Sequence, residues 1–302
     1  MNVDRTGVLV MAYGTPASRA DVADYYTRIR HGRPPSAEQL DDLVRRYDAI
    51  GGISPLAQRT DAQIRALAAE LERRHPGGFD VRLGTKYADP SIEDTAAGFM
   101  RDGIERVVGL VLAPHGSSMS TGEYFARARA ALGDAILVPI PHWYDAPGFD
   151  RLLAGRVHAA MASLPAPPHD TLVIFTAHSL PARILDEGDT YPEQVADSAA
   201  AVAAAAGIDR FEVAWQSAAR TPEPWIGPDI LEVLGGLPGR GVDRVVICPI
   251  GFVSEHLEVR YDIDIAAREV ADAHGVAMVR TRSLDDDPAF IALLASVTED
   301  AA

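Results

Sequence analysis

The sequence predicts an α/β protein of two similar domains, each a four-stranded parallel sheet with helices on its faces. Three observations lead to this prediction. Short apolar, β-branched runs recur, longer alanine-rich polar segments separate them, and a proline-rich passage divides the runs into two sets of four. Continuously apolar runs are typical of strands covered on both faces. Strands that alternate with helices indicate parallel sheets with right-handed crossovers.

Eight runs are expected to form the strands: 7–13, 81–86, 106–114, 135–141, 171–177, 211–217, 244–252 and 277–282. The segments between them show helical spacing, most clearly over 54–75 and 189–207. The passage "PIPHWYDAP" at 139–147 places the boundary near residue 142. We therefore expect an N-terminal domain over 1–142 and a C-terminal domain over 143–302.

Composition excludes several classes of protein. The net charge of −15 argues against binding to a nucleic-acid backbone, which needs a basic face. No run reaches the ~18 apolar residues of a membrane helix, and the N-terminus lacks a signal-peptide pattern. We expect a cytoplasmic protein without stable membrane insertion. The only cysteine, Cys248, cannot form an internal disulfide or a cluster held by four protein thiolates, and its apolar run predicts burial.

Polar and aromatic residues follow several predicted strands. Tyr13 follows the first run, His115 the third, His178 the fifth, and Gln216 and Ser217 end the sixth. Ligands of open α/β sheets bind outside the carboxyl ends of the strands. His178 alone would fit a buried structural histidine equally well. The agreement of several strand ends favours a functional site at this edge.

The stretch "SEHLEVRYDID" at 254–264 offers carboxylates next to that edge. In an α-helix, Glu255, Glu258 and Asp262 would share a face, because they stand at i, i+3 and i+7. Such a row could pass a hard divalent cation, and a carboxylate beside a histidine suits proton removal and metal ligation. A solvated acidic helix start is the alternative. His256 is expected to point elsewhere and to be structural.

A second unusual block lies at 21–36 and 45–60, where aromatic and aliphatic residues are mixed with Arg30 and Arg33. Such a surface could cover a flat apolar ligand while arginines hold its carboxylates. An amphipathic helix packed on the domain is the alternative, and composition alone favours it.

Seven motifs together resemble the ferrochelatase family, which inserts ferrous iron into a porphyrin. They are "MAYGTP", "YYTRIRHGR", "RYDAIGGISPLAQ", "VLAPH", "TAHSLP", "TPEPWIGPD" and "GFVSEHLEVRYDID", in the family's order over residues 7–264. The chain is most similar to the compact, cluster-free form of Gram-positive bacteria, which uses coproporphyrin III. The resemblance implies two Rossmann-like domains of the class II chelatase type with an active-site cleft between them. It also implies a monomeric lyase that makes coproheme in haem biosynthesis.

The resemblance assigns roles to particular residues. His178 and Glu258 are implied as the catalytic pair beside the metal, and Tyr13 as the residue that approaches the metal from the opposite side of the ring. The implied porphyrin-binding positions are Tyr13, Ile29, Arg30, Arg46, Ser54 and Tyr124. Asp262, with Arg46, matches an outer cation-binding region for which Mg²⁺ is a candidate. Fe²⁺ is a substrate in this family, and no resident cofactor is implied. A neutral His178 is expected to accept a pyrrole proton near pH 7.

The chain also departs from the family pattern. Ala266 stands where a glutamate usually follows the "DID" step, Tyr87 replaces a histidine, and Arg28 and His31 exchange the usual order of histidine and arginine. These differences keep a second hypothesis open, a chelatase for another divalent metal or another tetrapyrrole. A third, from a different class, is a non-catalytic tetrapyrrole carrier.

Overall fold

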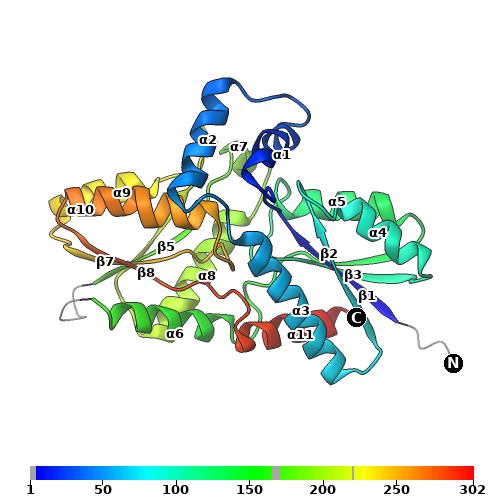
Figure 1. The fold of residues 1–302 in the computed structure, drawn as a ribbon. Coiled ribbons are helices and arrows are strands. Elements are labelled where there is room, and N and C mark those ends of the chain that lie inside the picture. The colour runs from blue at the N-terminus through cyan, green and yellow to red at the C-terminus, as the bar shows by residue number, and fades with distance from the viewer. Residues whose placement is uncertain (1–4, 165–170, 220) are drawn as a thin grey trace.

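The computed structural model describes residues 5–164, 171–219 and 221–302, which form two four-stranded parallel sheets (Figure 1). The first has the order β2-β1-β3-β4, with β1 (Thr6–Ala12), β2 (Phe79–Thr85), β3 (Arg106–Val111) and β4 (Ile136–Ile140). The second has the order β6-β5-β7-β8, with β5 (Leu172–His178), β6 (Phe211–Gln216), β7 (Arg244–Cys248) and β8 (Ala277–Arg280). Every pairing is parallel. The predicted fold class is confirmed.

Each predicted run overlaps one strand, although β1, β2 and β5 begin or end one or two residues outside their runs and other strands are shorter than the run. The run 244–252 continues past β7, which ends at Cys248 because Pro249 has no N–H to donate to a neighbouring strand. Within β1, Val8 and Val10 face one core cluster while Leu9 and Met11 face another. Both faces of the strand are therefore covered, which explains its unbroken apolar sequence.

Helices cover both faces of the first sheet. Helices α4 (Ile92–Arg101) and α5 (Thr121–Leu132) lie on one face. Helix α3 (Leu56–Arg74) and the C-terminal helix α11 (Pro288–Ala301) lie on the other, side by side in Figure 1. The last helix of the chain thus packs against the N-terminal half, through Phe290 and Leu294 among others.

The second sheet is covered in the same way. Helices α6 (Phe149–Met161) and α8 (Tyr191–Ala206) lie on one face. Helix α9 (Ile230–Gly236), a π-helix over Val259–Ala267 and α10 (Arg268–Ala273) lie on the other. One buried cluster contains residues of both sheets. The division into two domains near residue 142 stays a prediction, and the shared core and α11 join the two halves.

The remaining helices lie outside the two sheets. Helices α1 (Val22–Ile29) and α2 (Ala37–Ala49) project above the rest of the fold at the top of Figure 1. Helix α1 is amphipathic and buries Val22 and Tyr25, as one of the two interpretations of this block predicted. The short helices are η1 (Arg19–Asp21), α7 (Arg183–Asp186) and η3 (Pro238–Arg240). No helix within the described ranges is long and apolar enough to cross a bilayer.

Cys248 is buried in β7, as predicted, and burial raises the pKa of its thiol to about 12. The thiolate is the reactive form, so the folded protein is expected to resist a disulfide-exchange reagent at pH 8. One thiol should react once the protein is unfolded in denaturant, which a colorimetric titration measures. Stoichiometric labelling of the native protein at unchanged thermal stability would contradict this expectation.

Candidate active site

The structure brings His178 and Glu258 together. His178 is the last residue of β5, and Glu258 lies directly before the π-helix that follows β7. The distance from His178 Nε2 to Glu258 Oε1 is 3.6 Å, and their side chains are 34% and 36% exposed. Neighbouring parallel strands end at one edge of the sheet, which explains how residues 80 positions apart meet. The pair presents a titratable nitrogen and a carboxylate to an incoming ligand.

The surroundings of His178 favour its protonated form. Both ring nitrogens face acceptors, since Nδ1 lies 2.5 Å from the carbonyl oxygen of Ser179 and Nε2 faces Glu258. Burial alone would lower the pKa of His178, but the negative charge of Glu258 and the contact with the Ser179 carbonyl outweigh burial and raise the pKa to about 9. The expectation of a neutral His178 near pH 7 is therefore wrong for this structure, in which the pair is an imidazolium and a carboxylate.

Glu258 lies between two imidazoles. Its Oε2 is 3.5 Å from His256 Nε2, while His256 Nδ1 contacts the carbonyl oxygen of Ser254 at 3.0 Å. Burial raises the pKa of Glu258, but the two histidines outweigh burial and hold the pKa well below its usual range. The expectation that His256 points elsewhere is wrong. Helical spacing could not reveal this contact, because His256 precedes the helix.

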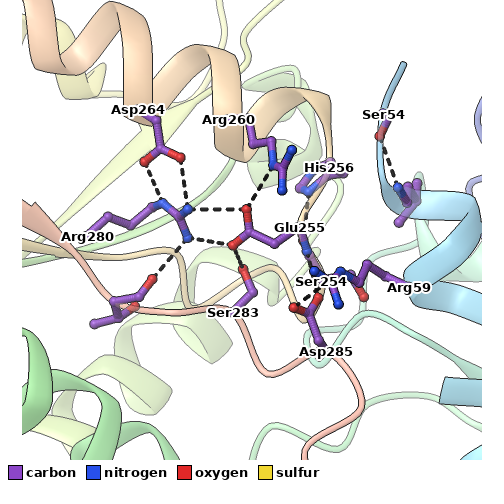
Figure 2. A network of polar contacts seen from close by, with 12 residues as sticks. Ser54, Arg59, Ser254, Glu255, His256, Arg260, Asp264, Arg280, Ser283 and Asp285 are labelled. Carbon is purple, nitrogen blue, oxygen red and sulfur yellow. Dashed lines mark hydrogen bonds and ion pairs between the residues drawn. The ribbon is translucent and has the colours of Figure 1, made fainter. Parts of the chain in front are cut away.

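The expected row of three carboxylates is also wrong. Residues Val259–Ala267 form a π-helix, whose hydrogen-bonding pattern changes which side chains share a face. Glu255 lies before the helix and is bound by Arg280 (Figure 2). Glu258 and Asp262, four residues apart, remain within electrostatic range of each other and of His178. Of the three carboxylates, Glu258 and Asp262 thus lie near His178, while Glu255 belongs to a separate network around Arg280.

Asp262 forms the outer part of this group. Ser217 donates to its Oδ2 at 2.5 Å, and Arg46 Nη1 lies 3.7 Å from its Oδ1. Burial, and after it the charge of Glu258, raise the pKa of Asp262 to about 6. Ser217 takes a φ of +63°, a conformation that non-glycine residues adopt at some strain and often at functional sites. Arg46 also lies over the ring of Tyr261, 5.0 Å from its centroid.

Tyr13 lies just past the end of β1 and is exposed. Its ring meets that of Tyr87 edge-on, with 4.9 Å between centroids. The turn after it requires glycine, because Gly14 has a φ of +86° and a Cβ there would lie 2.8 Å from that of Ala88. Tyr124 is buried, with Lys86 Nζ 5.3 Å from its ring centroid. Tyr13 and His178 thus follow the central strands of the two sheets.

The other predicted porphyrin-binding residues lie around α1 and α3. Ile29 ends α1 half-buried, and the guanidinium of Arg30 lies 5.8 Å from the ring centroid of Tyr26. Ser54 is buried, and its hydroxyl accepts from the N–H of Leu56 at the start of α3 at 3.2 Å. Ser54 therefore already has a structural role. Binding of porphyrin by these residues stays a prediction.

A pocket of about 490 Å³ lies beside Tyr87. Its walls carry cations and carboxylates from α1, from the turn after β2 and from α4 and α5: Arg28, His31, Lys86, Asp89, Glu93, Glu123 and Arg127. Lys86 Nζ is 2.6 Å from Glu123, and Arg127 Nε is 2.7 Å from Glu93. Three of the positions that depart from the family pattern, Arg28, His31 and Tyr87, thus line a charged recess next to the Tyr13–Tyr87 contact, while Ala266 lies on the π-helix.

Comparisons with known proteins identify the family of this chain. The family model described as "Ferrochelatase" matches residues 5–302. The coproporphyrin III ferrochelatase of Geobacillus kaustophilus is 45% identical over 297 residues, covering 96% of this chain and 94% of the relative. That of Bacillus subtilis is 42% identical over 303 residues, covering 98% of each.

Solved structures with the same fold include SirB from Bacillus subtilis with Fe³⁺, at a TM-score of 0.60 and 11% identity, covering 99% of this chain and 96% of that one. Another is CbiX, the terminal enzyme of sirohaem biosynthesis in denitrifying bacteria. Its TM-score is 0.58 at 16% identity, and the match covers 98% of this chain and 99% of that one. At these identities the likeness shows the fold alone, that of the chelatases. The match of the family model and the identity to full-length relatives show that this chain belongs to the ferrochelatase family.

Proposed function

We propose that this chain inserts ferrous iron into coproporphyrin III to form coproheme, as a lyase of haem biosynthesis. The observation that carries the proposal is the His178–Glu258 pair, 3.6 Å apart at the carboxyl edge of the second sheet. The names of the relatives supply the substrate, since those at 42–45% identity are coproporphyrin III ferrochelatases. Iron is a substrate here, and we propose no resident cofactor.

Metal insertion requires that two protons be removed from the porphyrin and that one metal ion be transferred to it. A free-base porphyrin must lose two pyrrole protons as the dication enters, so that charge and atoms balance. The imidazolium of His178 is held by the carboxylate of Glu258. A dication arriving at Glu258 offsets the negative charge that raises the pKa of His178, so His178 releases its proton. The proton that His178 releases goes to water. The neutral imidazole can then accept one pyrrole proton, pass it to water and accept the second, so that both protons end in solvent.

The substrate's carboxylates need cationic partners. Coproporphyrin III carries four propionates. Arg30 directly follows α1 as its C-cap, and Arg46 lies on α2. Arginine binds carboxylates with two parallel hydrogen bonds, which gives orientation as well as affinity. We infer that these arginines, with Ile29, Ser54 and Tyr124, hold the ring between Tyr13 and His178.

We further propose a cytoplasmic monomer that binds no nucleic acid. The net charge of −15 supports this proposal, since it disfavours a polyanionic partner. Light scattering coupled to gel filtration would test the monomer, and a dimeric mass at micromolar concentration would contradict it.

An anaerobic absorbance assay tests the proposed function. Purified protein is given Fe²⁺ with coproporphyrin III or protoporphyrin IX, and Co²⁺, Ni²⁺, Cu²⁺ and Zn²⁺ are run in parallel. We expect the highest kcat/KM for Fe²⁺ with coproporphyrin III. Preferred insertion of another metal would support the second hypothesis, which rests on Ala266 and Tyr87. Tight porphyrin binding without turnover of any metal would support the carrier.

The outer carboxylate yields a separate prediction. In Asp262→Asn the KM for the metal ion is expected to rise about tenfold, a loss of roughly 1.4 kcal/mol of metal binding, with porphyrin affinity unchanged. The pKa of Asp262 is raised to about 6. Metal affinity of the wild type should therefore fall as the pH drops through 6, and the variant should lack this dependence. Stimulation by added Mg²⁺, where present, should also disappear.

Asp42→Asn is the matched control for this prediction, because Asp42 contacts Arg46 from the other side at 3.0 Å. It should leave the KM for the metal close to that of the wild type. Equal effects of the two substitutions would assign the change to Arg46 and would contradict a direct role of Asp262.

A further inference from the structure

Arg280, the last residue of β8, has all five of its N–H donors occupied (Figure 2). Nε and Nη2 donate to the two oxygens of Asp264 at 2.7 and 2.8 Å. Nη1 and Nη2 donate to the two oxygens of Glu255 at 2.9 and 3.2 Å. Nη1 also donates to the carbonyl oxygen of Thr281 at 3.0 Å. The side chain is 13% exposed, so the guanidinium is nearly buried and bridges two carboxylates.

The two carboxylates stand on either side of Glu258 in the chain. Glu255 lies three residues before it, and Asp264 lies six residues after it on the π-helix. Glu255 is held further by the hydroxyl of Ser283 at 2.7 Å. Burial raises the pKa of Glu255, but Arg280 and its neighbours outweigh burial and lower the pKa to about 2. Glu255 is therefore ionised. Residues of β8 and of the loop after it bind the segment that carries Glu258 both before and after that residue.

The contacts of Glu258 itself are longer. Its carboxylate lies 3.6 Å from His178 and 3.5 Å from His256, beyond the ordinary length of a hydrogen bond. These contacts alone do not fix the carboxylate, so its place depends on the backbone on either side. That backbone includes a π-helix, a rare form that other interactions must hold in place.

We propose that Arg280 is a positioning residue for the insertion reaction. By binding Glu255 and Asp264 together it sets the backbone on both sides of Glu258, and so sets the carboxylate against His178. This inference rests on the proposed function of the His178–Glu258 pair. Arg280 does not touch the reacting atoms in this role. Lysine cannot replace it, because three donors on one nitrogen cannot make two bidentate carboxylate pairs and a carbonyl contact.

The test compares Arg280→Lys with a matched arginine elsewhere. Arg82 also binds two carboxylates, Asp80 at 3.0 and 2.6 Å and Asp102 at 2.6 Å, but it lies in β2 of the first sheet. We expect kcat of Arg280→Lys to fall about tenfold to a hundredfold, since small misplacements of reacting groups have effects of that size. Porphyrin affinity, measured by fluorescence, should stay at the wild-type value. Arg82→Lys should keep the wild-type kcat.

Hydrogen exchange provides a readout that does not depend on activity. Backbone amides of 255–264 should exchange faster in Arg280→Lys than in the wild type, while those of β5 stay protected. In Arg280→Ala, added guanidinium should restore part of kcat through the adjoining pocket of about 410 Å³, and sodium chloride at equal ionic strength should not. The pocket is lined by Arg280 and its two carboxylate partners together with Arg268 and Arg282.

Two results would overturn the proposal. One is a wild-type kcat and unchanged exchange in Arg280→Lys. The other is a parallel fall of kcat, porphyrin affinity and thermal stability, which would show a general loss of folding. A wild-type protein that inserts no metal would refute the proposed function instead, and the exchange experiment would still decide whether Arg280 holds the Glu258 segment.

Discussion

The His178→Ala variant is expected to lose metal insertion by about a thousandfold while it still binds porphyrin, in line with the usual contribution of a positioned acid or base. His178 lies at the end of β5 beside Glu258, with an Nε2–Oε1 distance of 3.6 Å. Without its imidazole, pyrrole protons must leave to water. The ring is a small part of any porphyrin-binding surface, so affinity should change little.

Anaerobic initial rates measure metal insertion, and fluorescence quenching by porphyrin measures porphyrin affinity separately. His158→Ala is the control, since His158 lies on α6 and contacts only the carbonyl oxygen of Ala206 with its Nε2, at 2.8 Å. It should retain full activity. Insertion by His178→Ala at more than a tenth of the wild-type rate would place the proton acceptor elsewhere.

Glu258→Gln is expected to stop insertion almost as completely, and also to change the ionisation of His178. The amide keeps the shape of the side chain but removes the charge that raises the pKa of His178 to about 9. Burial, which lowers that pKa, then dominates. The histidine of the variant should therefore titrate well below pH 9 and be neutral where the wild type is still protonated.

The same shift predicts a change in stability with pH. A histidine whose pKa is raised on folding stabilises the fold fully below its ordinary pKa of about 6.5, and this contribution disappears as the pH rises to 9. The free energy of unfolding, measured with denaturant near pH 6.5 and near pH 9, should fall between the two pH values in the wild type and not in Glu258→Gln.

An NMR titration of the ring protons, assigned with His178→Ala, measures the shift directly. Glu269→Gln, at an exposed position of α10, is the control for the loss of one negative charge. A His178 that still titrates near pH 9 in Glu258→Gln would mean that another group holds its proton, and the ion-pair description would be wrong.

Local sequence patterns predicted much of the architecture. Several strands could be located because they are covered on both faces and therefore continuously apolar, as in β5 and β7. The positions of Tyr13 and His178 follow from where those runs end. The docking of α11 on α3 could not be predicted, because its apolar face fits any apolar surface equally well and only the folded chain selects one.

Other features of the site depend on interactions without a local signature. The π-helix at Val259–Ala267 is defined by its backbone hydrogen bonds, which residue spacing does not encode, so the expected carboxylate row was wrong. The sequence did not point to a role for Arg280, because an arginine at the end of a strand is ordinary until the side chains that it contacts are known.

The sequence by itself determined the fold class, the strand ends that carry Tyr13 and His178, and a family resemblance that the comparisons confirm. Only the tertiary structure decided which carboxylate meets His178, which way Glu255 turns, and that the charge of Glu258 raises the pKa of the histidine. The reason is physical. Electrostatic coupling depends on distance through space and on burial, and both are set when β5, β8 and the π-helix come together.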